Sequence, residues 1–306
     1  RLTLARRYVK TQAYMRINPT EIILHSDSSV YHLGLQEGDI APFIITVGDP
    51  ARVERIATYF DSIRVRKSYR EFITLTGKIG GREISVLSTG MGSDNIDIVL
   101  NELDLVCNWN LKDRSPKKDR HTLRLVRLGT SGSIQPDIPL DSILVSERAL
   151  SVDALHAFYP HSDENIEWQE DLRHYFNLHQ LPTPYCFSSS MAFSHSLATA
   201  LNAQLGITYT ASGFYAPQGR RLFTEGEQKK DLNQILCNYR FEGSRITNIE
   251  METAALFHLG RLFGHSIASV SALLANRVTG EFSTQAEKTI DSMIASAIEF
   301  LLNEPH

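Results

Sequence analysis

The chain contains 306 residues, of which 42% are hydrophobic and 22% are charged, an ordinary composition for a globular protein. Its formal net charge of −4 gives no argument for binding to nucleic acid or to an anionic membrane. The 3 cysteines lie far apart and form no CxxC pair, so the sequence predicts reduced thiols in a cytoplasmic protein and gives no support for a zinc site. No stretch approaches about 20 consecutive apolar residues, so we expect no membrane span.

The first residues of the chain are basic. Four basic residues and no acidic residue precede Met15, and no apolar segment with a small-residue cleavage site follows them. We therefore do not expect these residues to be a signal peptide. We expect Met15 to be the native start, residues 1–30 to be a partly disordered or artificially added extension, and residues 31–306 to form a single domain.

Strand and helix patterns alternate along the chain. In the first half of the chain the pattern predicts a strand at 42–47, a helix at 51–60 and strands at 72–79 and 82–88. A further helix is predicted after Gly92. Gly80-Gly81, between the last two strands, is typical of a tight hairpin turn. The second half predicts strands at 123–128, 142–147, 245–249 and 266–274, and helices at 166–178, 251–263 and 284–303. This alternation favours a mixed α/β sheet with helices outside, and Gly264 is placed to cap the second of these helices.

Residues 110–121 form a polar, basic segment with Pro116 in its middle. This composition favours a solvated surface loop. A binding arm is the alternative, and nothing else in the sequence supports it.

Two strand ends carry groups suited to an anion. After the first strand come Gly48-Asp49-Pro50 and Arg52, where glycine lets a backbone N–H approach an anion and the next helix offers its N-terminus. Taken alone, this is also a common strand-to-helix turn. Arg127 ends an apolar run, and a cation buried there needs an anion, either a ligand or a structural carboxylate. The hydroxyls of Thr130 and Ser131 add donors.

Two further segments are ambiguous when they are read alone. Arg70 lies inside a β-rich run and reads as an exposed strand residue. Glu250 and Glu252 lie where a strand leads into a helix, a place where the helix dipole favours carboxylates and where α/β proteins also bind ligands. Residues two apart do not face each other on a helix, so this pair suits sugar hydroxyls better than coupled acid–base chemistry.

Six segments in order resemble the uridine phosphorylases, which belong to the trimeric and hexameric nucleoside phosphorylase superfamily. They are Tyr31-His32-Leu33-Gly34-Leu35, Gly48-Asp49-Pro50 with Arg52, Arg70-Glu71-Phe72, Ser88-Thr89-Gly90-Met91-Gly92, Arg127-Leu128-Gly129-Thr130 and Glu250-Met251-Glu252. The resemblance covers roughly residues 30–303. It implies an α/β fold, a three-layer α/β/α sandwich with a mixed, partly barrel-like central sheet. It also implies a homo-oligomer, with a dimer as the functional unit of a hexamer.

The resemblance also implies where nucleoside and phosphate would bind. Phosphate would be held by Gly48, Arg52, Arg127 and Thr130, with Arg70 donated by a neighbouring subunit. Ribose would meet Thr130, Met251 and Glu252, with His32 also donated by the neighbour. The implied catalytic set is Arg127, Gln218, Arg220 and Glu252. A monovalent cation such as K⁺ would bind at Glu71, Met91 and Asn95, although the family usually has serine at the last position; no other cofactor is expected.

The segment from Phe214 to Arg220 resembles the loop that recognises uracil. An amide from Gln218 and a guanidinium from Arg220 can read the polar edge of uracil, and Phe214 can stack on the base. Glu250, Leu274 and Ala275 would complete this pocket. Purine-cleaving relatives carry an aspartate after the strand that follows the Glu-Met-Glu helix, whereas here Ala272-Leu273-Leu274-Ala275-Asn276-Arg277 contains none.

These features predict phosphorolysis of uridine to uracil and ribose 1-phosphate in pyrimidine salvage, with the ranking of deoxyuridine and thymidine left open. One alternative is a purine or thioadenosine nucleosidase or phosphorylase on the same fold. Another is a non-catalytic nucleoside-binding protein. The arginines at positions 52, 70 and 127 argue against a protein that has lost its phosphate site.

Overall fold

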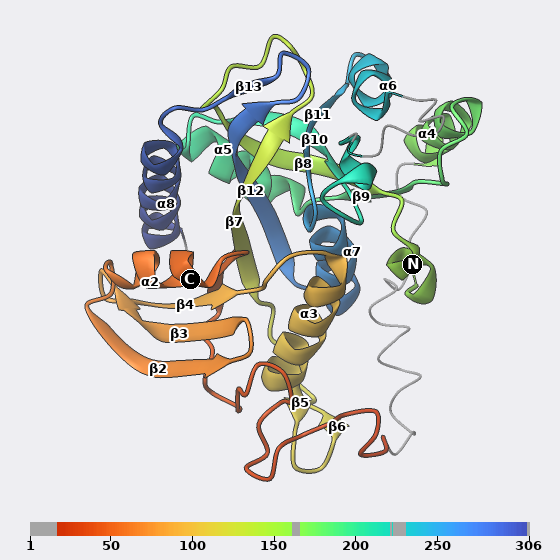
Figure 1. The fold of residues 1–306 in the computed structure, drawn as a ribbon. Helices are drawn as coiled ribbons and strands as arrows, with labels where there is room; N and C mark the ends of the chain where they lie inside the picture. The colour runs from red at the N-terminus through yellow and green to blue at the C-terminus, as the bar shows by residue number, and fades with distance from the viewer. Residues whose placement is uncertain (1–16, 161–165, 221, 223–230, 305–306) are drawn as a thin grey trace. The chain divides into compact units, whose positions relative to one another are not determined.

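The computed structural model describes residues 17–160, 166–220, 222 and 231–304 (Figure 1). These residues form two compact units. Unit 1 runs to Arg127 and includes Leu259–Ser266, and unit 2 contains the rest. The predicted extension lies largely outside the described residues, and the single domain from residue 31 stays a prediction. None of the helices in the described segments is long and apolar enough to cross a membrane.

Unit 1 is built on a mixed sheet in the order β2-β3-β4-β1-β7. Its elements are β1 (Phe43–Val47), α2 (Pro50–Ala57), β2 (Ser62–Tyr69), β3 (Phe72–Ile79), β4 (Arg82–Ser88), α3 (Ser93–Asn108) and the first residues of β7 (Arg124–Ser133). Strand β1 runs parallel to β4 and β7, and every one of its residues is buried. Strands β2, β3 and β4 form an antiparallel meander, with α2 packed against β3 and β4. The apolar run of β1 is explained by this central, doubly covered position.

The basic segment 110–121 is a surface hairpin tied to unit 1. Strands β5 (Trp109–Asn110) and β6 (Ser115–Pro116) pair antiparallel. Lys117 forms an ion pair with Glu37 at 3.1 Å. These contacts agree with the surface-loop interpretation and give the segment a structural role.

Asp104 on α3 fastens the end of this segment. Its carboxylate, only 6% exposed, accepts hydrogen bonds from Asn108 Nδ2 at 2.7 Å and from Arg120 Nη2 at 2.8 Å. His265 accepts from the backbone N–H of Leu123 through Nδ1, which leaves Nε2 facing Asp104 at 3.5 Å. Burial disfavours the charged form, but His265 and Arg120 outweigh it and hold the pKa of Asp104 below its ordinary value.

Unit 2 continues the β-structure in the order β13-β12-β8-β10-β11-β7, with β9 on β8. Its strands are the rest of β7, β8 (Ile143–Ser151), β9 (Tyr185–Ser188), β10 (Gln204–Thr210), β11 (Ile246–Glu250), β12 (Ser266–Asn276) and β13 (Glu281–Phe282). Its helices are η1 (Ala154–Phe158), α4 (Ile166–Leu178), α5 (Met191–Ala200), η2 (Ala216–Gln218), α6 (Leu232–Asn238), α7 (Thr253–Phe263), whose last turns belong to unit 1, and α8 (Ala286–Asn303). Strands β8, β10 and β11 are parallel, while β7, β9 and β12 pair antiparallel with their neighbours. Helix α5 packs on β8, β10 and α8.

Most predicted elements are confirmed, and the differences have local causes. Gly80 and Gly81 both adopt positive φ in the predicted hairpin, and Gly264 follows α7 at φ 79°. Strand β2 was missed because its exposed edge position carries arginine and lysine instead of an alternating apolar pattern.

We expect Asp104→Asn to lower the free energy of unfolding at pH 7 by about 1.5–3 kcal/mol, the range for hydrogen bonds to charged groups. The folded-state pKa of Asp104 is depressed, so its ionised form stabilises the fold fully above about pH 4, and this contribution is lost as pH falls through the lower folded-state pKa. Urea unfolding of both proteins at several pH values measures the difference. The matched control is Asp119→Asn, which changes an exposed carboxylate in the basic segment 110–121. Equal stability of the two variants would contradict this role for Asp104.

Candidate functional site

Parallel strands of unit 1 bring Gly48 and Arg127 to one part of the sheet. Arg127 on β7 pairs in register with Thr46 on β1, two residues before Gly48. Its side chain is buried, with the residue 6% exposed. A Cβ on Gly48 would lie 3.3 Å from the carbonyl oxygen of Gly90, so glycine permits this close approach of two strand ends. Carboxyl ends of parallel strands are the usual ligand edge of an α/β sheet.

Helix α2 begins at Pro50, one residue before the predicted start, and its N-terminus is already capped. The Asp49 carboxylate accepts a hydrogen bond from Ala51 N at 2.9 Å. An anion near this helix would therefore meet a carboxylate as well as the helix dipole. Arg52, in the first turn of α2, is the group here that suits phosphate.

Arg70 occupies a turn, which corrects its prediction as a strand residue. It is the first of the two residues that connect β2 to β3, and its φ is 54°. Hairpins of this length usually place glycine or asparagine at positive φ, because a side chain there is strained. The arginine side chain at this position is therefore held at a cost in stability, a pattern common at functional sites.

His32 and Arg70 lie in one aromatic cluster of unit 1. The Tyr31 ring meets the His32 ring edge-on at 4.9 Å, and the Arg70 guanidinium lies 5.9 Å from the Tyr31 ring and 5.7 Å from the Tyr69 ring. His25 stacks on Tyr31 at 5.3 Å. The structure thus brings together the two residues that the resemblance assigns to the neighbour's site.

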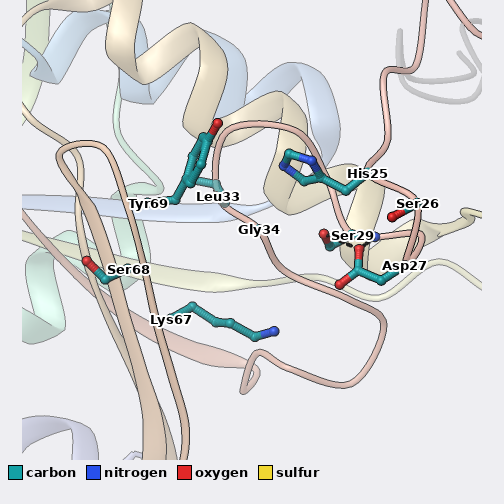
Figure 2. Close-up of a pocket in the computed structure, with 9 residues that line it drawn as sticks. All are labelled: His25, Ser26, Asp27, Ser29, Leu33, Gly34, Lys67, Ser68 and Tyr69. Atoms are coloured by element: carbon teal, nitrogen blue, oxygen red, sulfur yellow. Dashed lines mark hydrogen bonds between the residues drawn. The ribbon is translucent and has the colours of Figure 1, made fainter.

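A cavity of about 360 Å³ opens beside this cluster. Figure 2 shows its walls, with His25 and Asp27 on the loop before His32 and Lys67 and Tyr69 at the end of β2. Asp27 accepts hydrogen bonds from the backbone and hydroxyl of Ser29, and these bonds hold the pKa of its carboxyl below the ordinary value. The carboxylate is therefore committed to shaping the loop that carries His32.

The positions implied for a monovalent cation lie close to one another in unit 1. Asn95 Nδ2 donates to Glu71 Oε1 at 3.4 Å, and Met91 is 72% exposed. A Cβ on Gly90 would lie only 2.3 Å from Asn95 Nδ2. The amide thus presents its nitrogen, not its oxygen, to the carboxylate, an arrangement that fits a cation only if the amide turns. Across the described parts of the chain, no group of three or more histidine, cysteine, aspartate or glutamate side chains could hold a metal ion.

The predicted base-reading residues form a compact cluster in unit 2. The Arg220 guanidinium lies 3.6 Å above the Phe214 ring and donates to Gln218 Oε1 at 2.6 Å and to the Phe214 carbonyl oxygen. This bond orients the Gln218 amide and leaves its NH₂ group available as a donor. One face of Phe214 is occupied by Arg220, so a base would stack on the other face. Gln218 is 4% exposed and Phe214 is 50% exposed. A buried amide that hydrogen-bonds a base thus lies beside an exposed ring on which the base can stack.

Arg277 is a residue that the sequence did not single out. Its Nη2 donates to the Gln218 carbonyl oxygen at 3.2 Å, and its side chain packs over Gly132, where a Cβ would lie 3.1 Å away. Burial lowers the pKa of Arg220, and the nearby charge of Arg277 lowers it further. Two partly desolvated cations therefore lie at the base-reading loop, an arrangement that favours negative charge on a ligand.

Glu250 caps helix α7, which begins at Thr253 rather than at residue 251 as predicted. Its carboxylate, 4% exposed, accepts from Glu252 N at 2.9 Å and from Thr253 N at 3.0 Å. Thr210 Oγ1 donates to Glu250 at 2.6 Å and accepts from Ala254 N at 3.0 Å. These bonds satisfy the first N–H groups of the helix and fix the backbone that carries Met251 and Glu252.

Three further predicted residues of unit 2 lie on strands β7 and β12. Thr130 is half-buried on β7, and the hydroxyl of its neighbour Ser131 accepts from Asn248 Nδ2 at 3.0 Å. Leu274 and Ala275 are half-buried on β12. Asn276, which follows them, uses its amide for Gln135 O and for the N–H groups of the next turn. It is therefore a structural residue.

The chain is similar to several known proteins. A family model described as the phosphorylase superfamily matches residues 42–301. The uridine phosphorylase of Thermococcus kodakarensis is 28% identical over 272 residues, which span 89% of this chain and 86% of that protein. A DeoD-type purine nucleoside phosphorylase of Oceanobacillus iheyensis is 25% identical over 275 residues, spanning 89% of this chain and 98% of that protein.

A solved structure is also similar. The Trypanosoma brucei nucleoside phosphorylase, described as showing uridine phosphorylase activity, has a TM-score of 0.83 and 27% identity, covering 92% of this chain and 100% of that one. This likeness confirms the predicted fold, a layered α/β protein whose mixed central sheet is partly closed into a barrel.

The strain at Arg70 predicts an asymmetry between two substitutions. Arg70→Gly and Arg70→Ala both remove the guanidinium, but only glycine relieves the backbone at φ 54°. We expect the glycine variant to be more stable than the alanine variant by about 1–2 kcal/mol in urea unfolding at equal protein concentration. If the two variants unfold at the same urea concentration, the turn stores no such strain.

Proposed function

Because the chain belongs to the phosphorylase superfamily, we propose that it is a pentosyltransferase that splits uridine with inorganic phosphate into uracil and ribose 1-phosphate. The observation that carries this proposal is the cluster of Phe214, Gln218 and Arg220, which offers a stacking face, an amide and a guanidinium to one planar base. Relatives described as uridine phosphorylases support it. We also propose that the reaction serves pyrimidine salvage.

Phosphate is the nucleophile in this proposal, so the protein needs no nucleophilic side chain. A phosphate oxygen attacks the anomeric carbon of ribose while the glycosidic bond breaks and its electron pair passes to the base. Gly48 N–H, Arg52, Arg127 and Thr130 hold phosphate in position. Positioning of two reactants can lower the barrier by several kcal/mol, on the order of 7–11 at best.

The base leaves with negative charge spread over its ring, and the cationic loop of unit 2 suits this charge. Arg220 donates to the uracil carbonyl edge, and the Gln218 amide completes the contact. Arg277 adds positive potential from behind the loop. Negative charge forms on the base only in the transition state. Cations fixed beside the base therefore stabilise the transition state more than the substrate.

Ribose is held by Met251, Glu252 and Thr130, with Glu252 accepting hydrogen bonds from its hydroxyls. Glu250 acts indirectly by fixing the start of α7. The partner subunit's His32 and the partner subunit's Arg70 complete the site. The functional unit in this proposal is therefore a dimer, assembled further into a hexamer.

Purine cleavage is the competing function, because DeoD-type purine nucleoside phosphorylases are also relatives. A purine leaving group is protonated by an acid, and β12 contains no aspartate or glutamate. Asn276 has its amide committed to the local turn. Half-buried Leu274 and Ala275 offer an apolar wall to the base, which favours uracil over a purine.

Two minor proposals accompany the main one. A monovalent cation such as K⁺ would bind between paired subunits at Glu71, Met91 and Asn95, once Asn95 turns its amide oxygen inward.

The protein would work in the cytoplasm, since Cys107, Cys186 and Cys237 are free thiols. Burial raises the pKa of Cys107 to about 11, with the charge of Asp104 adding to it, so this thiol stays protonated at neutral pH.

The proposed reaction predicts phosphate-dependent release of uracil. We expect rapid release from uridine with phosphate present, almost none in phosphate-free buffer, and little cleavage of inosine or adenosine. Chromatography of the released base measures each rate, and deoxyuridine and thymidine in the same series rank the pyrimidine substrates. Equal uracil release without phosphate would overturn the phosphorylase assignment, and faster cleavage of a purine nucleoside would overturn the base assignment.

The shared site predicts complementation between two inactive variants. Arg70→Ala breaks the donated half and Arg127→Ala breaks the receiving half. A mixed dimer then has one site with both defects and one with neither, so activity should return to about half of normal per mixed dimer. Co-refolding with differently tagged chains, followed by uridine assay of the doubly tagged fraction, measures this. A doubly tagged fraction that remains inactive would place Arg70 within its own chain's site.

A further inference from the structure

Glu102 lies directly behind His32 in unit 1. It is on α3, 70 residues along the chain, and is 7% exposed. Its Oε1 contacts His32 Nδ1 at 2.7 Å, and its Oε2 accepts from Leu33 N at 2.7 Å. The backbone N–H of His32 lies 2.9 Å and 3.0 Å from the two oxygens. One buried carboxylate thus meets three N–H groups of a single dipeptide.

This arrangement determines which nitrogen of His32 faces outward. A carboxylate only accepts hydrogen bonds, so the Nδ1 that contacts it carries a proton. In neutral His32 the Nε2 atom is then a lone-pair acceptor for a hydroxyl. The side chain is 27% exposed, so the ring edge opposite Glu102 can reach a ligand.

The same cluster fixes the ring in space. Tyr31 contacts the His32 ring edge-on and lies beneath the Arg70 guanidinium. His32 and Arg70 therefore share one support, held to α3 by Glu102. His32 and Arg70 are the residues proposed to enter a neighbouring subunit's site. Holding them in place beforehand avoids the conformational entropy that ordering two mobile side chains on binding would cost.

We propose that Glu102 is a positioning residue for the transferase reaction, holding His32 in one tautomer so that Nε2 accepts from a ribose hydroxyl in the partner's site. This inference rests on the proposed function. Glu102 does not touch the nucleoside, and its effect passes through His32 alone. A merely structural role would instead leave its effect independent of His32 and of the sugar hydroxyls.

The test is a double-mutant cycle with Glu102→Gln and His32→Ala. The amide supplies one acceptor oxygen in place of two, so one of the three N–H groups loses its partner. We expect Glu102→Gln to lower kcat/KM for uridine by about 10- to 100-fold, the kinetic equivalent of a charge-assisted hydrogen bond. In the His32→Ala background the same substitution should change kcat/KM less than about threefold. Asp94→Asn, an exposed carboxylate on the same helix, is the matched control and should leave kcat/KM unchanged.

The substrate series identifies the hydroxyl. The penalty of Glu102→Gln is measured with uridine and with its 2′-, 3′- and 5′-deoxy analogues, and it should vanish for the analogue that lacks the hydroxyl bound by His32. A penalty that persists unchanged in the His32→Ala background, or for every analogue, overturns the inference. If the unsubstituted protein does not release uracil from uridine, the proposed function itself fails, and this outcome is distinct from an active parent with an unaffected Glu102 variant.

Discussion

Arg127 is a guanidinium held in an apolar strand, and the proposed chemistry depends on that burial. It is 6% exposed on β7, in register with Thr46 of β1. A cation in such a place is costly unless an anion or several acceptors compensate for its lost hydration. Phosphate is a suitable anion, and a site with little water strengthens the attraction between the two. In the proposed site the phosphate nucleophile would therefore pair directly with the buried Arg127 guanidinium.

Several residues outside the proposed contacts keep the polar groups of the site in fixed positions. Three parts of the proposed site are each fixed by another residue: the Gln218 carbonyl by Arg277, the Glu252 backbone N–H by Glu250, and the His32 ring by Glu102. Polar groups fixed in this way need not reorganise as charge moves from the sugar to the base. Arg70 differs, because its backbone conformation costs stability, which is consistent with a side chain retained for function.

The sequence predicted the parts that depend on local chemistry. The Gly80-Gly81 hairpin and the buried β1 strand follow from glycine conformations and apolar runs. The Phe214, Gln218 and Arg220 loop was recognised because its residues are close in sequence.

Other features depend on long-range contacts that no local pattern reveals. Arg277 reaches Gln218 across 59 residues and Glu102 reaches His32 across 70. The sequence predicts the start of α7 two residues too early, because Glu250 still belongs to β11 and its carboxylate caps a helix that begins at Thr253. The strand assignment of Arg70 was wrong because arginine gives no sign of positive φ.

In the proposed reaction phosphate, and not water, attacks the sugar. Mass spectrometry of the first sugar product, formed from uridine and phosphate labelled with heavy oxygen in ordinary water, tests it most directly. If phosphate is the nucleophile, the product is ribose 1-phosphate that retains every labelled oxygen, including the one bonded to the anomeric carbon. Free ribose as the first product, with an unlabelled anomeric oxygen taken from water, would contradict it.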